Sequence, residues 1–87
     1  MIDLKELNDF IIKVFNYYNG RINMVNMATL DINWANLMGT NAAGYSRLPN
    51  IVTINPMVII RFFNNDELSI KVSIIETIIH ELYHNMR

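Results

Sequence analysis

The sequence predicts a small α+β domain with an N-terminal helix, a small three-stranded sheet, a short helix and a C-terminal helix. Three observations support this prediction. Apolar residues recur every three or four positions near the N-terminus, alternate with polar residues in the middle of the chain, and return to helical spacing before the C-terminus. Spacing of three to four residues is typical of an amphipathic helix, and alternation is typical of a half-buried strand.

Composition narrows the class of protein. The 87 residues suffice for one small domain, residues 1–87, and 52% of them are hydrophobic, which is typical of a compact fold. The net charge is −1 and the basic residues are scattered, so nucleic-acid binding is not indicated. There is no cysteine, which excludes disulfides and thiolate metal sites. An acidic N-terminus and short apolar runs argue against a signal peptide or a membrane span, so we expect a cytoplasmic protein.

The first helix is predicted over residues 3–19. Asp3 is a suitable N-cap, and Glu6 three residues later completes a capping box. Asn19 and Gly20 both tolerate the left-handed backbone conformation found at helix ends. We therefore expect the helix to stop there.

The three strands are predicted in the segments "MATLDINWA", "AGYSRL" and "NIVTINP". The first alternates, with Leu30, Ile32 and Trp34 on one face. The loop at 36–44 precedes the second strand, and Pro49 and Pro56 bracket the third. Either "AGYS" or "NIVTI" could be the edge strand that pairs with an extended peptide.

Two helices are predicted after the sheet. Asn55 as cap and Pro56 in the first turn start a short helix over residues 56–63, which Asn64 and Asn65 close. The segment "DELSIKV" is open between loop and extended chain. Ser73 with Glu76 forms a second capping box and opens a helix from residue 74 to the end.

The last helix carries His80-Glu81-Leu82-Tyr83-His84, which matches the H-E-x-x-H pattern. Residues four apart lie one turn above each other on one helix face, so both imidazoles can bind one Zn²⁺. Zinc lowers the pKa of bound water to about 7, and Glu81 between the ligands is placed to accept its proton. The alternative is an exposed histidine pair without a metal.

A helical wheel separates two faces of this helix. Ser73 and Thr77 accompany His80 and His84 on the polar face. The opposite face is predicted to pack in the core and contains Ile75, Ile78, Ile79, Leu82 and Met86. We therefore expect the histidines to lie on the outside of the domain.

Together these segments resemble the SprT-like zinc metalloproteases, over about residues 7–86. The resemblance rests on "FNYYNG", "LDINWANLMGTNAAGYS", "IVTINPMVI" and "IIETIIHELYH" in that order. It implies a zincin-like minimal domain, zinc ligands His80 and His84, Glu81 as catalytic acid/base, and a protein or peptide substrate.

The resemblance also implies a third zinc ligand, usually a histidine further along the chain. No further histidine and no cysteine exist here, so the domain is expected to be truncated after the HExxH helix. The remaining candidates are an Asp or Glu within the chain, such as Glu76, a group from a second copy, and water. The acidic third ligand of ImmA/IrrE-like peptidases also lies beyond the motif.

The competing hypothesis is a catalytically incomplete relative that acts as a protein-binding module or inhibitor, of a kind that phages encode, with a homodimer as one option. Several other residues have ordinary predicted roles. Trp34, Tyr45 and Tyr83 are expected to pack in the core or at a sheet edge. Arg47 and Arg61 are expected to be solvated or to bind a partner's carboxylate.

Overall fold

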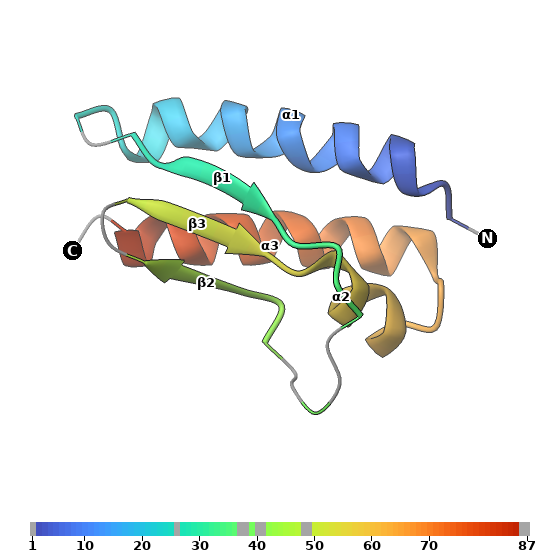
Figure 1. Ribbon diagram of the computed structural model, residues 1–87. Coiled ribbons are helices and arrows are strands. Elements are labelled where there is room, and N and C mark those ends of the chain that lie inside the picture. Colours follow the sequence, from blue (N-terminus) through green and yellow to red (C-terminus); the bar gives the residue numbers. More distant parts are fainter. Residues whose placement is uncertain (1, 26, 37–38, 40–41, 48–49, 86–87) are drawn as a thin grey trace.

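The computed structural model describes residues 2–25, 27–36, 39, 42–47 and 50–85. The described part contains three helices and a three-stranded mixed sheet, so the predicted α+β class is confirmed (Figure 1). No helix within these ranges is long and apolar enough to cross a membrane. The elements, in chain order, are α1 (Leu4–Ile22), β1 (Thr29–Ile32), β2 (Gly44–Arg47), β3 (Ile51–Ile54), α2 (Pro56–Phe62) and α3 (Glu67–Asn85).

The sheet has the order β1-β3-β2, with β3 in the centre (Figure 1). β1 pairs with β3 in parallel and β2 pairs with β3 antiparallel. The "NIVTI" segment therefore cannot be the edge strand, and "AGYS" lies on an edge. The central position of β3 also explains why Val52, Thr53 and Ile54 are all buried, although apolar and polar residues alternate in its sequence.

The core lies between the sheet and the two long helices. α1 and α3 pack against each other, α1 also contacts β1, and α3 contacts β2 and β3. The three helices and β3 contribute aliphatic or aromatic side chains that are at most 2% exposed. They include Leu7, Ile11 and Phe15 from α1, Val52 and Ile54 from β3, Ile59 from α2, and Ile70, Ile74, Ile78 and Leu82 from α3.

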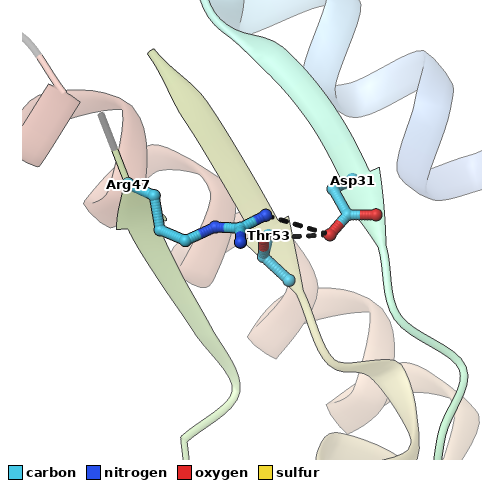
Figure 2. A network of polar contacts seen from close by, with 3 residues as sticks. All are labelled: Asp31, Arg47 and Thr53. Atoms are coloured by element: carbon cyan, nitrogen blue, oxygen red, sulfur yellow. Dashed lines mark hydrogen bonds and ion pairs between the residues drawn. The ribbon is translucent and has the colours of Figure 1, made fainter. Parts of the chain in front are cut away.

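The outer sheet face carries a polar network that joins all three strands (Figure 2). Arg47 Nη2 of β2 lies 3.7 Å from Asp31 Oδ2 of β1. Thr53 Oγ1 of β3 donates to the same oxygen at 3.2 Å. Arg47 thus pairs with a carboxylate of its own chain, and Arg61 Nη1 donates to Asn36 Oδ1 at 2.9 Å.

Helix α1 begins as predicted and ends later than predicted. Asp3 Oδ1 accepts hydrogen bonds from Lys5 N at 2.9 Å and Glu6 N at 3.3 Å, which confirms the cap. The predicted stop at Asn19 is wrong, because the helix continues to Ile22.

The reason is that Asn19 has another role. Its side chain is buried, its Nδ2 donates to Ala28 O at 2.8 Å, and its Oδ1 accepts from Ala28 N at 2.9 Å. Both polar groups of one backbone residue are satisfied by one amide side chain. Asn19 therefore fixes the connection from α1 to β1 and does not end the helix.

Helix α2 matches the prediction apart from its cap. Pro56 is the first residue, and Asn64 and Asn65 follow the helix with φ values of 50° and 64°. Asn55 makes no side-chain capping bond, however. Its Nδ2 instead donates to Ala42 O at 3.0 Å.

Helix α3 corrects the predicted start at residue 74. It begins at Glu67, and Ser73 lies in its interior. Ile70 N donates to Asp66 O at 3.0 Å, and the Ser69 hydroxyl donates to the Asp66 carboxylate. Asp66 thus precedes the helix in the way an N-cap does, and the segment "DELSIKV" is helical from Glu67 on.

The buried side of α3 is rotated relative to the predicted one. Ile78 and Leu82 are buried as predicted, Ile75 and Ile79 are only half-buried, and Met86 lies outside the described residues. Ile70 and Ile74 extend the buried stripe toward the helix start. The rotation also places Glu81 in the buried set, which matters for the site.

The aromatic predictions divide. Trp34 packs against the core as predicted, and its Nε1 donates to Asn8 Oδ1 at 3.1 Å. Tyr45 lies on the edge strand β2, which agrees with the sheet-edge alternative of its prediction. Tyr83 is exposed on α3, so its expected packing role is wrong.

Candidate metal centre

The two histidines meet on the exposed side of α3. His80 and His84 are one turn apart, and their Nε2 atoms lie 2.9 Å from each other. Their ring centroids are 4.4 Å apart. Both side chains are exposed, as the helical wheel predicted. Two imidazole nitrogens therefore converge on one point at the helix surface.

This arrangement fits two positions of a zinc site. Two nitrogens bound to tetrahedral zinc at 2.0–2.1 Å are about 3.3 Å from each other. The observed 2.9 Å separation needs an increase of a few tenths of an ångström, which exposed imidazoles can provide by small rotations. Neutral imidazole is also a usual zinc ligand. The histidine pair thus suits zinc by donor type and by spacing.

A third ligand is not part of this arrangement. No group of three His, Asp or Glu that could hold a metal occurs in the described ranges, which include every His, Asp and Glu of the sequence. Glu76 lies one turn before His80 and is exposed, but it does not join the histidines in such a group.

Glu81 has an environment unlike that of the histidines. Its side chain is 8% exposed, and it turns toward β2. Ser46 Oγ of β2 lies 2.9 Å from Glu81 Oε1 and 2.9 Å from Glu81 O. Burying a carboxylate is costly unless it is hydrogen-bonded. The Ser46 hydroxyl supplies this hydrogen bond.

A close approach of β2 to α3 brings Ser46 and Glu81 together. A Cβ atom at Gly44 would lie 2.9 Å from Thr77 Cγ2 and 2.9 Å from Thr53 O. Real Cβ atoms do not come so close, so only glycine permits this spacing without a shift. Gly44 and Ser46, two small residues on the inner face of β2, therefore let the strand lie directly against α3.

A hollow of about 360 Å³ opens beside this contact. Its walls come from the start of β2 and from the polar face of α3. They are lined by Ala43, Gly44, Glu76, Thr77, His80 and Glu81. One imidazole and two carboxylates thus border a space next to an edge strand.

Asn55 holds the chain segment at the mouth of the hollow. Its backbone N donates to Ala43 O at 2.7 Å and its Nδ2 donates to Ala42 O at 3.0 Å. Asn55 is 1% exposed, and its Oδ1 is buried with no hydrogen-bond partner. Asn55, directly after the central strand β3, therefore fixes the segment that leads into β2.

The structure brings His80 and His84 together, places Glu81 at the same hollow as His80, and adds Gly44, Ser46 and Asn55. A polar residue at an inward position of a short strand was a signal for Ser46, and a glycine in a strand often marks close backbone approach. Asn55 does precede α2 as Asn-Pro predicted, but this helix-start signal gave no indication of its side-chain bond to Ala42. None of these sequence signals identifies the distant residue that Gly44, Ser46 or Asn55 contacts in the folded chain.

The chain was compared with protein-family models, with curated proteins and with solved structures, and none of the three comparisons gave a match.

Proposed function

We propose that this chain is a zinc-dependent metallopeptidase-like protein of the SprT-like, zincin-like kind. His80 and His84 would hold the metal, and Glu81 would act as general base. The observation that carries the proposal is the joint geometry of the motif. Two exposed Nε2 atoms lie 2.9 Å apart, while the glutamate between them is buried at the hollow beside an edge strand.

A zinc ion held there would supply Lewis-acid polarisation of water and of a substrate carbonyl. The chain's own residues supply the rest. Glu81, held by Ser46, accepts a proton from the attacking water and passes it to the leaving amine. β2 is an edge strand at the wall of the hollow, so an extended peptide could pair with its free side. The substrate class is therefore a protein or peptide.

The proposal requires a third donor from outside the chain's His, Asp and Glu residues. A group from another protein chain or a water molecule meets this requirement. If the donors come from a second copy, two histidine pairs share one metal and the protein:zinc ratio is two to one. If water completes the site, the ratio is one to one.

The test measures zinc uptake and peptide cleavage. Equilibrium dialysis should show zinc bound to the wild-type protein and lost in His80→Ala and His84→Ala. Glu81→Gln should retain zinc and lower cleavage of an unstructured protein by roughly 10²- to 10⁴-fold, because general acid–base catalysis contributes that much. Glu76→Gln is the matched control, since Glu76 borders the same hollow and should leave zinc uptake unchanged.

A wild-type protein that takes up no zinc under these conditions contradicts the proposal. So does zinc uptake that persists in both histidine variants. Uptake with no cleavage in the wild type and in Glu81→Gln alike retains the metal site but rejects the peptidase.

A protein-binding or inhibitory role is the second candidate, favoured by an apolar surface on α2 and α3. Phe62 is 75% exposed and Leu68 is 73% exposed, and Val72 of α3 is also exposed. Exposed groups of large apolar side chains often mark protein interfaces. A chain that binds no zinc, but forms a complex that Phe62→Ser and Leu68→Ser weaken, would support this role.

A further inference from the structure

Among the described residues, the Ser46 hydroxyl is the hydrogen-bond partner of the Glu81 carboxylate. It lies equally close to two acceptors of the same residue, Oε1 and the backbone O, each at 2.9 Å. Ser46 Oγ thus lies between the carboxyl group of Glu81 and the backbone of the same residue.

We propose that Ser46 is a positioning residue for Glu81, which holds its carboxyl group in one rotamer. This inference rests on the proposed function, because a general base must stay aligned with the reacting groups.

The position of Ser46 is fixed on both sides. Ser46 pairs with Val52 of the central strand, and Val52 is fully buried. Gly44, two residues earlier on the same face, lets β2 approach α3 closely. The hydroxyl is thus supported by the sheet, while the carboxyl it contacts is supported by α3.

The first test follows the Glu81 rotamer in the zinc-free protein by NMR. The Glu81 carboxyl carbon is assigned by its loss in Glu81→Gln, and side-chain three-bond couplings are measured at one fixed pH. The variants are Ser46→Thr, which keeps the hydroxyl, and Ser46→Val, which has the shape of threonine without the hydroxyl. Ser73→Ala is the control for loss of a half-buried hydroxyl elsewhere in the domain, on α3.

We expect a single Glu81 rotamer in the wild type, Ser46→Thr and Ser73→Ala, and averaged couplings in Ser46→Val. Equal couplings in Ser46→Val and Ser46→Thr would overturn the inference. Ser46→Ala provides a second hydroxyl-free variant should valine prevent folding. The rotamer measurement does not depend on catalysis, so it decides the role of Ser46 even if the protein cleaves nothing.

The second test uses the zinc-loaded protein. Ser46→Val should lower kcat for peptide cleavage roughly tenfold or more, the effect of removing a hydrogen bond to a charged group, while KM and zinc content stay unchanged. Recovery of kcat in Ser46→Thr is expected. A loss in Ser46→Val that appears in KM alone would contradict a positioning role. An inactive wild type would reject the peptidase proposal itself.

Discussion

At the scale of single residues, buried asparagines were the hardest to interpret from sequence. Asn19 and Asn55 both occupy places where asparagine commonly starts or ends a helix. Both instead bond to backbone groups of a neighbouring segment, Ala28 and Ala42. Propensity describes what an asparagine does when its surroundings are water. It carries no information on which distant backbone groups need a hydrogen-bond partner. In this domain, those backbone groups determined where the two asparagine side chains bond.

Asn19→Ala should destabilise the protein by about 2–4 kcal/mol, because two buried backbone groups of Ala28 lose their partner. Urea denaturation followed by circular dichroism measures the change. Asn16→Ala is the matched control, an exposed asparagine on the same helix, and should be neutral within about 0.5 kcal/mol. Similar losses in the two variants would show that the Asn19 bonds contribute little.

At the scale of elements, the periodic signals were reliable and the boundaries were not. The types of the six elements were predicted mainly from apolar spacing, and "AGYSRL" was assigned from a weak signal that the structure confirms. The start of α3 failed because two capping patterns stand close together, one at Asp66 and one at Ser73. The chain uses the first, since an earlier start also buries Ile70 in the core.

Asp66→Ala should therefore lower stability by about 1 kcal/mol through loss of a side chain at the start of α3. Thermal unfolding with and without the substitution measures this effect. Ser73→Ala is the informative comparison, because it should change stability by less than about 0.5 kcal/mol if Ser73 is an interior helix residue. A larger effect at Ser73 than at Asp66 would contradict the observed helix start.

The site shows the same division between local and distant information. The histidine pair follows from helical spacing alone, and its convergence was predictable once the helix was. The burial of Glu81 was not, because it depends on a glycine and a serine in a strand 35 residues away. A wheel assigns directions around one helix and cannot show which neighbour covers each direction.

At the scale of the whole molecule, the domain is a sheet covered on one face by α1 and α3 (Figure 1). Its other face carries the Asp31–Arg47–Thr53 network (Figure 2). The two charged side chains are 50% and 53% exposed, so water screens their attraction. Stability should come mainly from the covered face.

A double-mutant cycle with Asp31→Asn and Arg47→Met tests whether the outer face of the sheet contributes little to stability. The coupling energy between the two residues should be below about 1 kcal/mol, and it should fall as salt is added. Chemical denaturation of the four proteins at low and high salt gives both values. A coupling of several kcal/mol would mean that the outer face contributes much more to the fold than exposure indicates.

The contact between Ser46 and Glu81 also sets an order of events during folding. The histidine pair lies within one helical turn, so a short peptide with the sequence of α3 has both imidazoles in register as soon as it is helical. The Ser46 contact spans 35 residues and exists only after the loop between strand and helix has closed. Under the proposed function, metal capture would therefore precede folding, whereas alignment of the base would wait for the native topology.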